Sequence, residues 1–202
     1  MTKHDMTLMY AMHDALRREL EHLAKLAARE DDDPRAILAG APGWELFKTA
    51  LHAHHTAEDE ALWPVMREAL AARPDAIALL DAMEAEHAAI DPIIEAIDNG
   101  TQPLDKMVDA LAAGLDAHLK HEEDEALPLM DEAVTAEQMA GFGQAHAAKI
   151  GPDAPRVFPW LVDGADAKTV ETALAPLPPP VRAAFENEWR PAYEALNRWN
   201  TP

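Results

Sequence analysis

The sequence predicts an all-α protein: an up-down-up-down four-helix bundle with an additional helical C-terminal extension. Alanine is abundant and β-branched residues are sparse among the 202 residues, which favours helices. Apolar residues recur at intervals of three and four rather than two, which is the period of a helix with one buried face. Four such segments are joined by modest loops, an arrangement in which neighbouring helices run antiparallel.

The first two helices each carry polar residues on their apolar face. The first is expected from about residue 5 to residue 30, and the charge run and proline at 31–34 should end it. The second should begin near Trp44, and Pro64 should kink or end it. The predicted inward faces are Met6, Met9, His13, Leu16, Leu20, Leu23 and Ala27, followed by Phe47, Leu51, His54, Glu58, Leu62 and Val65.

The third and fourth helices repeat this arrangement. Pro74 and Asp75 open the third, and the sequence at 98–100 supplies its stop. The fourth is expected from about residue 104 to residue 132. Their inward faces read Leu80, Met83, His87, Ile90, Ile94 and Ile97, and then Leu104, Val108, Leu111, Leu115, His118, Glu122, Ala126 and Leu129.

We divide the chain into a bundle domain, residues 1–132, and a helical C-terminal extension, residues 133–202. Helices are expected at about 135–150, at 166–175 and from the triple proline at 178–180 to Trp199, with a proline-containing stretch at 151–159. Trp160, Trp189 and Trp199 lie in the extension. We therefore expect it to pack on the bundle as a lid or to form a dimer contact.

Composition excludes several classes of function. The chain has no cysteine, so thiolate metal sites and cysteine nucleophiles are excluded and a reducing compartment is indicated. Its formal net charge is −20, from 17 basic and 37 acidic residues, and such a surface repels phosphate backbones and anionic lipids. We expect a cytoplasmic protein that binds neither nucleic acid nor membrane. The excess acid would also attract metal cations, although it more often serves solubility alone.

One short pattern occurs twice, 64 residues apart. His54 precedes Glu58 by four residues, and His118 precedes Glu122 by four; further acids, a proline and a methionine then follow at matching places. This spacing places each imidazole and its carboxylate on one helix face, one turn apart. The repeat indicates a duplicated structural unit.

Six polar residues occupy positions that periodicity assigns to the core. A lone core histidine is usually satisfied by a carbonyl, but all four helices carry at least one imidazole, and two add a carboxylate. Buried carboxylates are costly unless a cation compensates them. We therefore predict a metal site made of His13, His54, Glu58, His87, His118 and Glu122.

The remaining histidines are placed by their position on the helices. His4, His22 and His52 are expected at the surface, and His146 is left unassigned. His55 and His121 flank the inward faces, so each is a ligand, a hydrogen-bond partner of a ligand, or exposed.

Four imidazoles and two carboxylates suit iron or manganese, with zinc as a competitor, and glutamates that can bridge two ions favour a dinuclear centre. A ferritin-like centre would instead require Glu-x-x-His on two helices. Only the segment from Glu84 to His87 approaches that pattern.

The order His13, His54-x-x-x-Glu58, His87, His118-x-x-x-Glu122 resembles the hemerythrin-like (HHE cation-binding) family, of the bacterial type with a C-terminal extension. This resemblance implies two iron ions bridged by Glu58, Glu122 and an oxo or hydroxo group. The histidines would be terminal ligands, with an open position for dioxygen, hydrogen peroxide or nitric oxide.

The predicted third helix differs from that of the oxygen carriers of the family. The oxygen carriers have two histidines one turn apart on this helix. In this sequence the positions one turn before and after His87 are Met83 and Asp91, with Glu84 nearby. Simple reversible oxygen carriage is therefore in doubt. His55, Glu84 and Asp91 are kept as possible additional ligands, and Tyr10 is expected either to line the ligand cavity or to pack in the core.

Two functions remain open at this point, besides a bundle that binds no metal. The first is reaction with a small oxidant, including catalase- or peroxidase-type or other oxidoreductase activity at a di-iron centre. The second is a non-enzymatic module that senses oxygen or iron.

Overall fold

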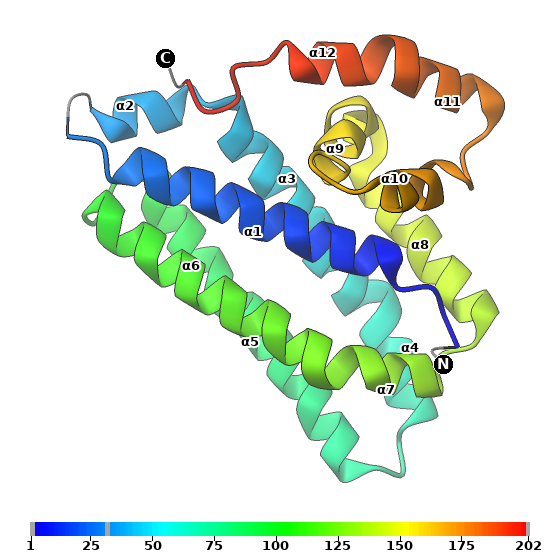
Figure 1. Ribbon diagram of the computed structural model, residues 1–202. Coiled ribbons are helices and arrows are strands. Elements are labelled where there is room, and N and C mark those ends of the chain that lie inside the picture. The colour runs from blue at the N-terminus through cyan, green and yellow to red at the C-terminus, as the bar shows by residue number, and fades with distance from the viewer. Residues whose placement is uncertain (1–2, 31–32, 201–202) are drawn as a thin grey trace. The chain divides into compact units, whose positions relative to one another are not determined.

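A computed structural model describes residues 3–30 and 33–200 of the chain (Figure 1). Within these residues all regular structure is helical and no strand occurs, so the predicted all-α class is confirmed. None of the helices in this part of the chain is both long and apolar enough to cross a bilayer.

The chain forms two compact units. The first unit comprises Met1–His4 and His52–Lys149, and the second comprises Asp5–Leu51 and Ile150–Pro202. The boundary that we placed between residues 132 and 133 stays a prediction.

Four long helical segments occur in the predicted order. They are α1 (Thr7–Ala27); α3 (Pro42–Ala57) continued by the π-helical turn η1 (Glu58–Leu62) and α4 (Trp63–Ala69); α5 (Pro74–Asp98); and α6 (Leu104–His121) continued by the π-helical turn η2 (Glu122–Ala126) and α7 (Leu127–Ala133).

A short helix, α2 (Pro34–Ala39), occupies part of the stretch that we expected to be a loop. The Asp33 carboxylate accepts hydrogen bonds from the backbone N–H groups of Arg35 and Ala36, and Pro34 stands in the first turn. Both features favour a helix start. Residues 31 and 32, part of the predicted stop of α1, lie outside the described residues.

The extension is helical, as predicted, but its helices differ in extent. The proline-containing stretch at 151–159 is helical rather than irregular, and the last helix ends at Glu194, before Trp199. The elements are α8 (Ala136–Ile150), the 3₁₀ turn η3 (Gly151–Asp153), α9 (Ala154–Leu161), α10 (Ala167–Leu174), α11 (Pro179–Ala184), the π-helical turn η4 (Phe185–Trp189) and α12 (Arg190–Glu194).

The π-helical turns explain how the helical path passes Pro64, where we expected a kink or an end. In η1 the N–H of Trp63 donates to the carbonyl of Glu58, five residues back. Proline has no N–H and its ring clashes with the carbonyl four residues back, so a widened turn just before it relieves the clash. The turn η2 repeats this arrangement before Pro128. Pro92 lies inside the regular helix α5, so proline alone does not produce a π turn.

In the first unit, α5 packs against α6, and the short connection at 99–103 makes the two helices antiparallel (Figure 1). Leu80 and Met83 of α5 and Leu111 and Leu115 of α6 are fully buried. The α8 helix of the extension belongs to this unit. His4 is buried and its ring hydrogen bonds to the carbonyl of Val134 (2.8 Å), so our surface assignment of His4 was wrong.

In the second unit, the rest of the extension packs on α1 through α9 and α10. Trp160 is fully buried, with the guanidinium of Arg18 5.4 Å from its ring. The indole N–H of Trp199 donates to the buried carboxylate of Glu19 (2.8 Å). These two tryptophans therefore pack within one chain, whereas Trp189 is only partly buried.

Candidate metal centre

The duplicated pattern forms a duplicated local structure. Glu58 and Glu122 are the first residues of the turns η1 and η2, and His54 and His118 stand one turn earlier on α3 and α6. π-helical turns inside α-helices occur frequently at functional sites. Here each turn begins at a fully buried carboxylate.

All six residues that periodicity assigned to the core are buried: His13, His54, Glu58, His87, His118 and Glu122. Five of them belong to the first unit. His13 lies on α1 in the second unit, so its participation in the same site stays a prediction.

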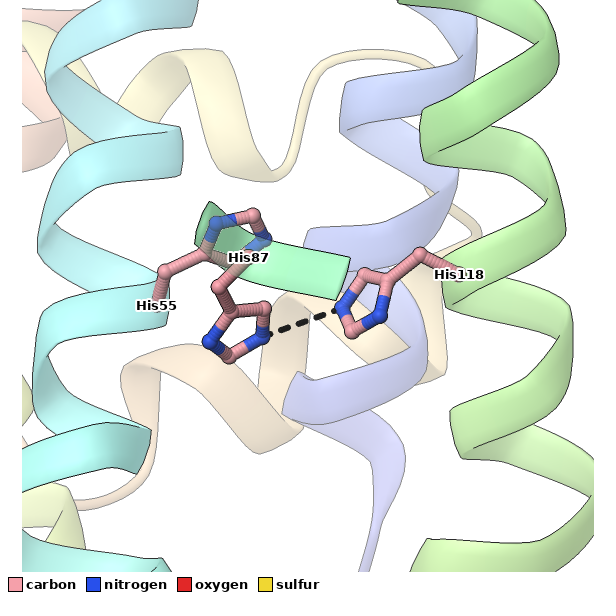
Figure 2. Close-up of side chains that lie close together, drawn as sticks. All are labelled: His55, His87 and His118. Carbon is pink, nitrogen blue, oxygen red and sulfur yellow. Dashed lines mark hydrogen bonds between the residues drawn. The ribbon is translucent and has the colours of Figure 1, made fainter. Parts of the chain in front are cut away.

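Three imidazoles from three helices come together in the first unit. His55 of α3, His87 of α5 and His118 of α6 each offer a ring nitrogen, and these nitrogens lie within 4.8 Å of one another (Figure 2). The Nε2 atoms of His87 and His118 are 3.1 Å apart, with the rings at 77° to each other. A ligand atom of His54 and one of Glu122 also lie within 4.8 Å of each other.

Two carboxylates form hydrogen bonds with the Nδ1 atoms of His87 and His118. The Nδ1 of His87 lies 2.8 Å from Oδ1 of Asp59, and the Nδ1 of His118 lies 2.9 Å from Oε2 of Glu86. Ionised carboxylates only accept hydrogen bonds, so both Nδ1 atoms carry the proton. Glu86 also bonds Nδ1 of His121 through its other oxygen (2.8 Å). In metal sites such carboxylate partners fix the tautomer and orientation of ligand histidines.

The Nε2 atoms of His87 and His118 face each other. Burial lowers the pKa of His118, and the nearby His87 lowers it further, which favours a neutral imidazole. With its proton on Nδ1, a neutral His118 directs the lone pair of its Nε2 toward the Nε2 of His87. A cation between the two rings would accept that lone pair.

The spacing fits a metal ion. Two nitrogens at about 2.1 Å from one ion and at right angles are about 3 Å apart, and the observed separation is 3.1 Å. His55, however, stacks on His87 with ring centres 3.9 Å apart and planes 8° apart. A ligand lone pair lies in the ring plane, so parallel stacked rings do not converge on one point. One ion bound by all three histidines therefore requires the ring of His55 or His87 to turn.

Glu58 stands between two imidazoles. Its Oε1 lies 3.5 Å from Nε2 of His54, and its Oε2 lies 3.6 Å from Nε2 of His87. Within the described part of the chain neither oxygen has a hydrogen-bond partner, and the residue is fully buried. Burial raises the pKa of Glu58 well above its ordinary value, and the nearby charge of Glu122 adds to the shift. A carboxylate with one oxygen toward each imidazole is placed to bridge two ions.

Other candidate residues lie elsewhere. Glu84 pairs with Arg67 (2.8 Å) and Asp91 is exposed, so the structure brings neither to the histidines. Tyr10 is 44% exposed and not in the core. His52 is exposed as predicted, whereas His22 is half-buried and stacks on Trp199.

Sequence reasoning missed the roles of Asp59 and Glu86. A signal was present, because each acid is adjacent in sequence to a predicted ligand, Glu58 and His87 respectively. His55, an open alternative in the sequence, is buried at the site.

The chain matches the model of a known protein family. The family model for the hemerythrin HHE cation-binding domain matches residues 4–130. No curated protein and no solved structure matches the chain significantly. The matched range contains every predicted metal ligand and ends before α8.

Proposed function

Because the chain belongs to the hemerythrin HHE cation-binding domain family, we propose that its buried histidines and glutamates bind two iron ions and that the loaded site binds or reacts with a small oxidant. Dioxygen, hydrogen peroxide and nitric oxide are the candidate oxidants. The observation that carries this proposal is Glu58, a fully buried carboxylate without a hydrogen bond among the described residues and with one oxygen facing each of two imidazoles.

The proposed ligands fall into two sets. His55, His87 and His118 would hold one ion, and His54 and Glu122 the other, with Glu58 between the two sets. His13, buried on α1, is assigned as a further ligand from its position in the sequence. His55 would add a third imidazole to the set that contains His87, although the third helix itself has no second histidine.

The protein's own residues would have three tasks. The histidines and glutamates bind the ions, Asp59 and Glu86 keep the Nε2 atoms of His87 and His118 directed inward, and burial keeps bulk water away. Bound iron would supply Lewis acidity and redox chemistry.

The ligand set is tested by metal analysis. Wild-type protein should contain two irons per chain and absorb as a ferric dinuclear centre. Glu58→Ala and His118→Ala should each lose dinuclear binding, because each substitution removes a ligand, while His52→Ala on the exposed face of α3 should retain it. Two irons per chain in either ligand variant would contradict the assignment. Wild-type protein without iron, and with a melting temperature unchanged by a chelator, would indicate a bundle that binds no metal.

An oxygen- or iron-responsive module is the second candidate. One observation favours it: α9 and α10 of the extension pack on α1, the helix that carries His13. Mixing iron-loaded protein with peroxide separates the two functions. Catalytic evolution of oxygen would identify an enzyme of the catalase type, whereas a reversible change in absorption without turnover would identify a binding or sensing module.

A further inference from the structure

The extension brings a histidine to the predicted metal ligands. His146 lies on α8, beyond the last residue of the family match. One turn before it Phe142 is buried, and three residues after it Lys149 forms an ion pair with Glu60 of η1 (2.5 Å). One face of α8 therefore lies against the α3–η1 segment, within the first unit.

The ring of His146 stands edge-on to the ring of His54. Their centres are 6.1 Å apart and their planes are at 89°, while the ring of Phe142 lies 6.4 Å away on the same helix. The Nε2 atom of His146 is buried and, among the described residues, has no hydrogen-bond partner. Buried polar atoms in proteins are nearly always satisfied, so this nitrogen indicates a partner that the polypeptide itself does not supply.

The geometry argues against direct coordination beside His54. The ring nitrogens of His146 join neither group of ligand atoms that lie within 4.8 Å of one another, although the ring centres of His54 and His146 are 6.1 Å apart. This position suits a hydrogen bond to a small molecule bound beside His54.

We propose that His146 is a binding residue for the small ligand: its Nε2 contacts a diatomic or triatomic molecule held beside His54, so that the C-terminal extension completes the site. This proposal rests on the proposed function, because it requires ions at the histidines and glutamates. It assigns α8 a role in ligand selection, beyond that of a lid.

The test measures azide binding to the iron-loaded, full-length protein. His146→Leu removes the ring nitrogens and keeps an apolar side chain of similar size. We expect it to retain two irons and to bind azide at least tenfold more weakly, equivalent to about 1.4 kcal/mol. His146→Gln places an amide near the position of Nε2 and should recover part of the affinity. Gln144→Ala, at an exposed position of the same helix, should bind azide as the wild type does.

The outcomes separate this proposal from the function on which it rests. Unchanged azide affinity in both His146 variants, with two irons retained, would overturn only the role of His146. Loss of iron in His146→Gln would also overturn it, because His146 would then be a metal ligand. A wild-type protein that binds neither iron nor azide would refute the proposed function itself.

Discussion

Substitution of Glu58 by glutamine should affect the metal-free and the iron-loaded protein in opposite directions. Glu58 is fully buried and its pKa is raised by burial and by Glu122. In the metal-free protein the folded state therefore either holds a proton that the unfolded state has released or retains a poorly solvated charge. Glutamine has nearly the same shape and no charge, so the metal-free variant should be more stable than the metal-free wild type.

The size of the effect follows from proton linkage. A raised pKa means that the folded state binds more protons, so the stability of the metal-free wild type falls as pH rises above the ordinary glutamate value of 4.5. The fall is at most about 1.4 kcal/mol per pH unit, which limits the loss at pH 7 to about 3.4 kcal/mol. Glu58→Gln should recover about 1–3 kcal/mol of this, because its amide must still be accommodated.

In the presence of iron the wild type should be more stable than Glu58→Gln. An ion at 100 times its dissociation constant stabilises the folded state by about 2.7 kcal/mol, and Glu58→Gln should lose this gain because it lacks the bridging carboxylate. Urea unfolding at pH 5 and pH 7, with a chelator or with iron, measures all four states. Glu60→Gln, at an exposed position of the same turn, is the control. A metal-free Glu58→Gln protein less stable than the wild type, or stabilised by iron to the same extent, would refute this reasoning.

Two further predictions concern residues around the site and in the second unit. Glu86→Ala should weaken iron binding about 10- to 100-fold in competition with a chelator, because His118 loses its hydrogen-bond acceptor. Glu86→Gln should lose less iron affinity than Glu86→Ala. Equal losses of affinity in the two variants would contradict an orienting role for Glu86. Gly43→Ala should destabilise the protein by about 1–3 kcal/mol and shift its tryptophan fluorescence, because a Cβ there would lie 2.6 Å from the Trp199 ring. Gly114→Ala, which meets no atom within 4 Å, should leave stability equal or higher, and equal effects of the two substitutions would contradict the contact with Trp199.

The spacing of apolar residues was sufficient to predict the long helices but not the short ones. Helices α1, α5 and α6 each contain several turns of apolar residues, so the apolar spacing of three and four residues is repeated often enough to identify a helix. The helices α2 and α9 have six and eight residues, too few turns for a clear repeat, and both contain proline. Short helices gain most of their stability from tertiary packing, which no local pattern reveals.

The same distinction applies to the candidate site. The sequence determined that His54, Glu58, His87, His118 and Glu122 face inward, because helix geometry alone places residues at this spacing on the buried face. Only the tertiary structure decided that His55 stacks on His87, that Asp59 and Glu86 bond the Nδ1 atoms of His87 and His118, and that His146 approaches His54. Those contacts join residues on different helical segments, and they depend on the rotation and relative height of each segment, which are set by packing and not by the local order of residues.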